Sequence, residues 1–325
     1  MFFLLFLHCK KQLPQNPYYR LFQSHQTTDI SSYKPVTGWN NRIAPISALH
    51  IDYIKQMNLI DKFDEVPQST EKFLLMQKRL RSLQNSFAPE IRTLLEQYIL
   101  GIYFCKNLGG TGISGIVYQN NTPTGGFIIL DADMIDQPAN DWISSKEQSV
   151  FGKSNLNVSI QIEKPENNSR ENALRYIFLH EFGHILSVVK NIVPDFREQH
   201  RDFSGYAFFK DTWIDENTSN YDNRFPLRKK IRFYSQNTLD PGDNWEQIYP
   251  LLDKTPFPTL YSSMHPDEQF ADFFVWYVHT HIDRRPWLLE VKKDGETLYR
   301  SDFPDSRFAR EKSIVKNILY RNKKQ

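Results

Sequence analysis

Apolar and polar residues alternate in two different ways along the chain. Between Ile46 and Leu100 apolar residues recur every three or four positions, as in the stripe from Phe73 to Leu83, which predicts helices. From Gly101 onward, short apolar runs separated by glycine-rich segments predict three strands, at 102–104, 113–118 and 127–130. Helices surrounding a small, mostly antiparallel sheet indicate the α+β class.

The strongest helical pattern covers residues 168–191. Leu174, Phe178 and Phe182 begin an apolar stripe that continues to Val189 at helical spacing, so one broad face is expected to be buried. Either Asn168 or Ser169 can cap the start, and Glu171 stands three residues after Asn168, as in a capping box.

This helix contains His180-Glu181-Phe182-Gly183-His184. Two histidines four positions apart lie one turn apart on one helix face, where both imidazoles can bind one metal ion. Glu181 lies roughly 100° around the helix, close to the metal but beside the ligands, where a base acting on water is needed. Gly183 allows another segment to approach closely. The motif therefore predicts a catalytic zinc site.

Catalytic zinc usually has three protein ligands and one position open to water. A third histidine six residues after His184 would define a metzincin, but Lys190 occupies that position, which excludes that class. Four other residues remain alternatives, each ranked below the candidate described next: Asp195, His265, His279 and His281.

The preferred third ligand is Glu268. Pro266 is suited to the first position of a helix, on which Glu268 and Asp272 share a face because they are four residues apart. The small Ala271 would permit close packing against the histidine helix. We predict that Glu268 binds the metal and that Asp272 accepts a hydrogen bond from a ligating histidine, most simply His180.

These two segments resemble the gluzincin metallopeptidases, in which the histidine motif is followed by Glu-x-x-Ala-Asp. The stretch from Tyr261 to Asp272 is similar to the lethal-factor type of that group. The resemblance covers both helices and the linker into the second. It implies a zincin-like metallopeptidase fold, in which a metal-binding active-site helix is joined by a second ligand-bearing helix. It also implies the following site: one catalytic Zn²⁺ on His180, His184 and Glu268, Glu181 as general base, and Tyr261 as donor to the oxyanion.

The predicted function is therefore that of a zinc-dependent endopeptidase acting on peptide or protein substrates. The alternative is a surface-anchored binding protein with a structural or vestigial zinc site, although such a site has no use for Glu181 as a base. Tyr261 has an alternative role as an ordinary core tyrosine.

Two further motifs indicate no chemistry. The segment Gly109 to Gly112 lacks the Lys-Ser/Thr end of a phosphate-binding loop, so we predict a hairpin turn there and another at Gly125-Gly126. Asp131, Asp133 and Asp136 lack the glycine and distal glutamate of a calcium loop, and we expect them to be solvated.

Composition and charge restrict the classes of molecule that the protein is expected to bind. The net charge of +2 includes no concentrated basic surplus, which argues against nucleic acid as a partner. With two cysteines, a cysteine-based zinc site is excluded. The apolar run Met1 to Leu7, followed by Cys9 and a polar stretch, resembles a bacterial lipoprotein signal. It predicts export and membrane attachment through a lipidated Cys9 at the cell envelope or surface. The alternatives are an apolar arm packed on the domain and a cytoplasmic or secreted soluble protein.

Three regions are predicted. Residues 1–35 form an apolar start and a tether or surface-wrapping arm, 36–100 a helical region packed on the core, and 101–325 the catalytic domain. An insertion at about 194–259, with expected strands at 206–209 and 231–234, would shape the binding site or form a lid. A hairpin around Asp294-Gly295 and a helix at 305–320 would complete the chain.

Overall fold

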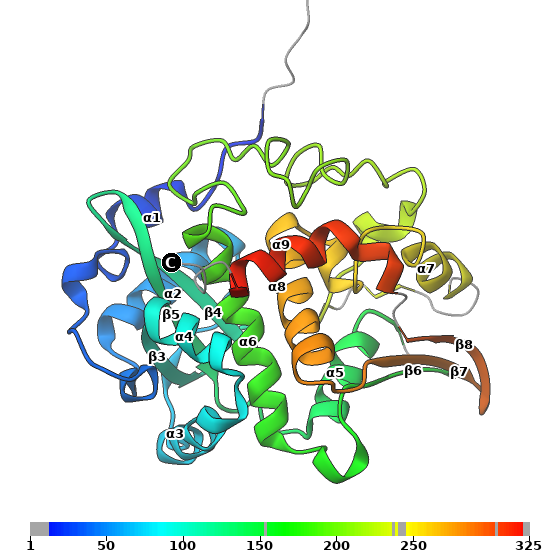
Figure 1. The fold of residues 1–325 in the computed structure, drawn as a ribbon, viewed down its shortest axis with the longest axis horizontal. Helices are drawn as coiled ribbons and strands as arrows, with labels where there is room; N and C mark the ends of the chain where they lie inside the picture. Colours follow the sequence, from blue (N-terminus) through cyan, green and yellow to red (C-terminus); the bar gives the residue numbers. More distant parts are fainter. Residues whose placement is uncertain (1–12, 153–154, 236–237, 240–244, 303–304, 321–325) are drawn as a thin grey trace, which may run out of the picture.

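The computed structural model describes residues 13–152, 155–235, 238–239, 245–302 and 305–320. Helix α6 (Arg170–Val189) runs through the centre, with a five-stranded sheet on one side and helix α8 followed by a three-stranded sheet on the other (Figure 1). The other helices are α1 (Tyr19–Ser24), α2 (Ala48–Asp61), α3 (Phe73–Ser82), α4 (Pro89–Tyr98), α5 (Ala139–Gln148), α7 (Trp245–Leu252), α8 (Pro266–Tyr277) and α9 (Ala309–Tyr320). The predicted α+β class is confirmed.

The five-stranded sheet is mixed. Its strands are β1 (Ile43–Pro45), β2 (Gln68–Ser69), β3 (Ile99–Lys106), β4 (Gly112–Gln119) and β5 (Thr122–Asp131). The order is β1-β3-β5-β4, with β1, β3 and β5 parallel, β4 antiparallel to β5 at the edge, and β2 antiparallel to β3. The prediction of antiparallel strands is therefore wrong for β3 and β5. The chain leaving β3 crosses beyond β5 before it returns as β4, so β3 and β4 are not neighbours.

The turns of this sheet do not lie at the glycine pairs where the sequence predicts them. The β4–β5 hairpin turns at Asn120-Asn121, whose φ angles of 50° and 63° match a two-residue type I′ turn. Gly125 and Gly126 lie inside β5, where a Cβ on Gly126 would meet the Gly115 carbonyl oxygen at 2.4 Å. These glycines let the strands and α6 approach closely, and the prediction of a turn there is wrong.

The loop after β3 is likewise no hairpin turn, because it leads across the sheet. Asp131 holds this loop: its carboxylate accepts hydrogen bonds from the backbone N–H of Leu108 at 2.9 Å and of Asp133 at 2.8 Å. Asp131 is buried, so the expectation that it is solvated is wrong. The partly exposed Asp133 and Asp136 form ion pairs with Lys72 at 2.8 and 3.7 Å.

Helix α6 begins at the Ser169 cap, whose hydroxyl accepts a hydrogen bond from the Asn172 N–H at 3.2 Å. Asn168 instead accepts from the Asn140 N–H, so no capping box forms between Asn168 and Glu171. Helices α6 and α8 cross where both lack bulk: a Cβ on Gly183 would lie 2.9 Å from Ala271 Cα. The predicted close approach of another segment at Gly183 is confirmed, and α8 is that segment.

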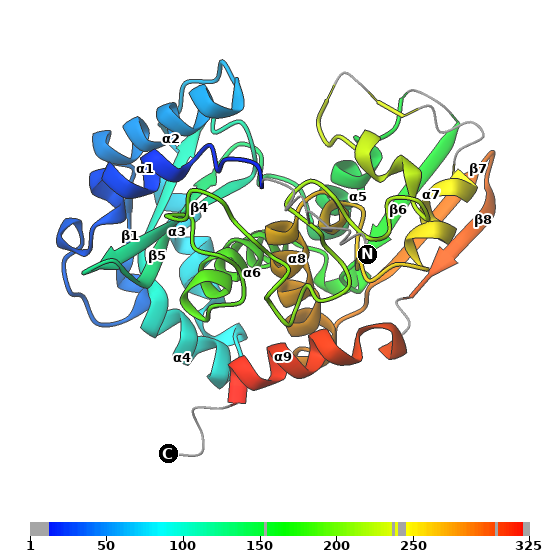
Figure 2. The same ribbon diagram turned by 90° about the horizontal axis from the view of Figure 1, so that it is seen from above.

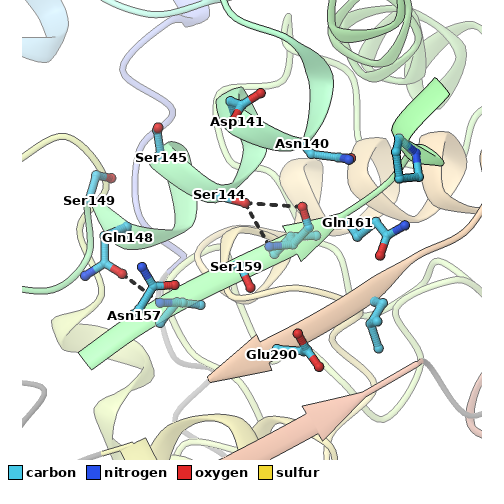
Figure 3. Close-up of a pocket in the computed structure, with 14 residues that line it drawn as sticks. Asn140, Asp141, Ser144, Ser145, Gln148, Ser149, Asn157, Ser159, Gln161 and Glu290 are labelled. Atoms are coloured by element: carbon cyan, nitrogen blue, oxygen red, sulfur yellow. Dashed lines mark hydrogen bonds between the residues drawn. The ribbon is translucent and has the colours of Figure 1, made fainter. Parts of the chain in front are cut away.

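The second sheet has the order β6 (Leu156–Gln161), β7 (Leu288–Lys293) and β8 (Glu296–Ser301), all antiparallel. The predicted hairpin at Asp294-Gly295 joins β7 to β8, and the predicted C-terminal helix is α9. On its other edge β6 faces α5 across a polar groove of about 810 Å³ (Figure 3). Ser144 accepts from the Ile160 N–H at 2.9 Å and Gln148 from the Val158 N–H at 2.8 Å. These side chains replace a neighbouring strand, because unpaired buried backbone groups are costly.

The insertion contains no strands at 206–209 or 231–234, where they were predicted. Its described residues form turns, a 3₁₀ helix at Pro226–Lys230, and α7. Its aromatic residues pack on one another and on neighbouring elements such as α8; Phe208, for example, meets Phe209 and Phe270 edge-on, with ring centroids 5.0 and 5.1 Å apart. This packing explains the error, because burial of aromatic residues does not require strand pairing.

Residues 13–35 lie along the insertion and the first sheet. The Asn16 N–H donates to the Gln199 carbonyl at 2.8 Å, and Phe22 stacks on Phe196 with centroids 4.7 Å apart. The apolar run Met1 to Leu7 and Cys9 lie outside the described residues. Within the described part of the chain, every helix is too short or too polar to span a membrane.

Candidate metal centre

The two motif histidines face α8 from one side of α6. Their ring centroids are 5.0 Å apart. Glu268 Oε2, from the first turn of α8, lies 3.2 Å from His180 Nε2 and 3.5 Å from His184 Nε2. The three ligand atoms lie within 4.8 Å of one another. No other set of described residues gathers three potential metal ligands in this way.

The charges at this point suit a cation. Glu268 Oε2 is buried, yet no described residue donates a hydrogen bond to it. Burial lowers the pKa of His180, but its contacts with Asp272 and Glu268 outweigh this and raise the pKa to about 10. Burial raises the pKa of Glu268, but the two imidazoles hold it well below the usual range. Two carboxylates facing two imidazoles, with one oxygen lacking a donor, form a donor set that fits Zn²⁺.

Asp272 lies where the sequence predicts it. Its Oδ1 is 2.8 Å from His180 Nδ1, and its other oxygen accepts a hydrogen bond from the Thr259 hydroxyl. With a proton held on Nδ1, a His180 that gives up its Nε2 proton to a metal would direct the Nε2 lone pair at Glu268 and His184. Burial alone would raise the pKa of Asp272, but the hydrogen bond with His180 outweighs burial and the net pKa is lowered. The carboxylate therefore stays ionised.

Glu181 projects toward β4, at the edge of the sheet. Ser114 Oγ lies 2.7 Å from Glu181 Oε2 and 2.8 Å from the Glu181 carbonyl oxygen, so its hydroxyl can orient the carboxylate. A Cβ on Gly112 would lie 2.7 Å from Glu181 Oε1. Our sequence analysis missed both residues. The available signal was the three small residues Gly112, Ser114 and Gly115 close together within a strand.

Tyr261 lies in a 3₁₀ turn just before α8. Its ring centroid is 5.8 Å from that of His180, and Lys146 Nζ lies 3.5 Å from the centre of the ring. Burial, reinforced by the charges of Glu268 and Glu181, raises the pKa of Tyr261 well above its ordinary value. The phenol therefore keeps its proton at neutral pH and can act as a hydrogen-bond donor.

The four alternative ligands do not join this group. Asp195 accepts from the Tyr118 hydroxyl at 2.5 Å, and His265 caps α8 by accepting from the Asp267 N–H at 3.2 Å. The buried His279 places Nε2 2.6 Å from the Ile162 carbonyl oxygen, and the His281 ring stacks on Tyr277.

Side chains of the insertion contact Asp267 and Gln269, the residues on either side of Glu268 in the sequence. Arg201 forms a two-pronged ion pair with Asp267, with N–O distances of 2.6 and 2.8 Å, and both side chains are buried. Trp213 Nε1 donates to Gln269 Oε1 at 2.6 Å. These contacts orient the first turn of α8 and so place Glu268. Sequence reasoning missed them because nothing local pairs Arg201 or Trp213 with α8.

The site forms the floor of a cavity of about 630 Å³. Figure 2 shows α2 and α5 on opposite sides of α6, and these two helices contribute to opposite walls. The α2 wall includes Asp61, Phe63 and Glu65, and the α5 wall includes Lys146 and Phe233. A cavity of this size accommodates several side chains of a peptide.

No protein-family model matches the chain, and neither a curated protein nor a solved structure matches it significantly. The resemblance to gluzincins therefore rests on the motif residues alone.

Proposed function

We propose that this chain is a zinc-dependent endopeptidase with a zincin-like fold. The observation that carries the proposal is the convergence of His180, His184 and Glu268, two of which, His180 and Glu268, line a cavity together with Glu181. A purely structural zinc site needs neither an adjacent carboxylate nor an accessible cavity. Both features support hydrolysis over a binding role.

Zinc held by the three ligands would supply Lewis-acid activation of water and of the scissile carbonyl. Glu181, oriented by Ser114, accepts the proton of the attacking water and delivers it to the leaving amine. Tyr261 donates a hydrogen bond to the carbonyl oxygen as that oxygen gains negative charge. Asp272 keeps the Nε2 lone pair of His180 directed into the site.

The sheet supplies a place for the peptide backbone. Strand β4 lies at the sheet edge, and its first residues, Gly112 and Ile113, line the cavity. An extended peptide can pair with such an edge as an added strand. The peptide would then run past Glu181, which contacts the same strand through Ser114.

Two substitutions test the proposal. Glu181→Gln keeps the ligands, so it should retain zinc by elemental analysis and lose cleavage of a broad peptide library. His184→Ala should lose the metal itself. Digestion of the library by the intact protein, with and without a chelator, is the control. Cleavage retained in Glu181→Gln would overturn the mechanism, and zinc binding without any digestion would support the binding-protein alternative.

A further inference from the structure

The α5 wall of the cavity carries the ammonium group of Lys146, which the carboxylates of Glu147 and Asp272 attract from beyond ion-pair distance. Lys146 Nζ lies 3.5, 5.7 and 5.9 Å from the ring centres of Tyr261, Phe233 and Trp142. Among the described residues, no carboxylate lies within 4 Å of this ammonium group. Other lysines of the protein do form ion pairs: Lys106 Nζ, for example, lies 2.9 Å from Glu71 Oε1.

A second cation lies on the same wall. Arg232 is exposed and lines the cavity next to Phe233, and its guanidinium donates to backbone carbonyls of Lys229 and Ile231 at 3.1 and 2.7 Å. It has no ion pair within the described part of the chain. The opposite wall carries the carboxylates of Asp61 and Glu65, so the cavity is basic on one side and acidic on the other.

The surroundings of Lys146 strengthen its attraction for an anion. The ammonium group of the half-buried Lys146 lies over the ring of Tyr261 and near the rings of Phe233 and Trp142, and Coulomb interactions grow as the local dielectric falls. An ammonium group held over an aromatic ring can bind a carboxylate from its open side. Tyr261 joins this position to the metal centre, since its ring centroid is 5.8 Å from that of His180.

We propose that Lys146, assisted by Arg232 nearer the rim, binds an acidic side chain of the substrate, so that the cleaved bond lies close to an Asp or Glu. An extended peptide advances about 3.3 Å per residue, which places the acidic residue within about two positions of that bond. The inference deepens the proposed endopeptidase function and rests on it. The group bound by Lys146 would be a carboxylate. A peptide carries a carboxylate at its C-terminus as well as on Asp and Glu side chains, so the test has to distinguish the two.

Binding is measured first, without turnover. Zinc-loaded Glu181→Gln protein is titrated with two fluorescent peptides that differ only by Glu or Gln and are blocked at both ends. We expect about tenfold tighter binding of the Glu peptide. Adding Lys146→Met should abolish the preference, Lys146→Glu should reverse it toward a Lys peptide, and Lys146→Arg should keep it.

Lys164→Glu is the matched control, because this exposed lysine lies outside the cavity and its change alters net charge equally. Equal binding of the Glu and Gln peptides, or a preference that Lys164→Glu reverses as fully as Lys146→Glu, would overturn the inference. A preference seen only with unblocked C-termini would assign the carboxylate to the peptide end and overturn recognition of a side chain.

Library digestion by the protein with Glu181 intact separates the two proposals. Cleavage next to acidic residues supports both. Cleavage without such a preference contradicts acidic recognition and leaves the endopeptidase function in place. A binding preference for the Glu peptide without any cleavage would contradict the endopeptidase function and retain Lys146 as a carboxylate-binding residue.

Discussion

The two helices that carry the proposed ligands position them in different ways. On α6, His180 and His184 share a face because they are four residues apart, and the pitch of the helix suffices. On α8, Glu268 follows 84 residues after His184, and its direction depends on Arg201 and Trp213 from the insertion. One part of the site is therefore local and the other tertiary.

This difference assigns a role to the insertion. It was expected to shape the binding site or to act as a lid, and Arg232 and Phe233 do line the cavity. It also makes buried polar contacts with Asp267 and Gln269 on α8. If α8 depends on them, damage to the insertion should weaken the metal site, whereas α6 should stay intact.

The largest effect is expected for Arg201→Met. It leaves the buried Asp267 carboxylate without its guanidinium partner and with only the His265 imidazole, 3.4 Å away, as an ion-pair neighbour, which should lower the free energy of unfolding by about 3–5 kcal/mol. Zinc affinity should fall too, because Glu268 is the next residue. Denaturant titration and chelator competition measure the two effects. The double variant Arg201→Met/Asp267→Asn removes the stranded charge and should recover part of the stability. Unchanged stability and affinity in Arg201→Met would show that α8 needs no support.

A change of pH should destabilise the contact between the insertion and α5 without the Arg201→Met substitution. Glu147 on α5 accepts a hydrogen bond from Tyr249 of α7 at 3.0 Å, and burial raises the pKa of Glu147 from 4.5 to about 7. Between these values the unfolded chain releases a proton that the folded protein keeps, so stability should fall as pH rises from 4.5 to 7. The total loss is about 3 kcal/mol.

Urea unfolding at several pH values, compared between the wild type and Glu147→Gln, isolates this group from the others. The substituted amide is neutral in both the folded and the unfolded state, so the curve of the variant should lack the fall. Parallel curves for the two proteins would show that Glu147 is ionised in the folded protein and that the insertion is insensitive to it.

Asp272→Asn tests whether α8 helps to position His180 on α6 through the contact between Asp272 and His180. Asparagine keeps the size of the side chain but removes the charge that holds the proton on His180 Nδ1. Zinc affinity should fall about 10–100-fold, with the fold intact by circular dichroism. Thr259→Val, which removes only the hydroxyl that donates to Asp272, is the graded control and should lose less. Full affinity in Asp272→Asn would mean that α6 positions both histidines alone.

Trp213→Phe should have the smallest effect. It keeps an aromatic ring and removes the N–H that donates to Gln269, at a cost of about 1 kcal/mol in unfolding free energy. Zinc affinity should change less than in Arg201→Met, because no charge is stranded. An equal or larger loss of affinity in Trp213→Phe would make this hydrogen bond the main support of α8.

The comparison between the helices also describes what could be predicted. The α6 helix, the close approach at Gly183 and the hairpin at Asp294-Gly295 followed from spacing within short segments. The parallel pairing of β3 with β5 did not, because the same apolar run suits either direction and the choice depends on where the chain crosses.

The sequence by itself determined the elements and the chemistry that one helix can hold, because periodicity and side-chain type act over a few residues. It set His180, Glu181 and His184 on one helix and Glu268 with Asp272 on another. Only the tertiary structure decided that these helices meet, that Ser114 orients Glu181, and that Lys146 lies over the ring of Tyr261 beside the site. Such contacts join residues far apart in the chain, and their free energy comes from packing and burial that no local pattern encodes.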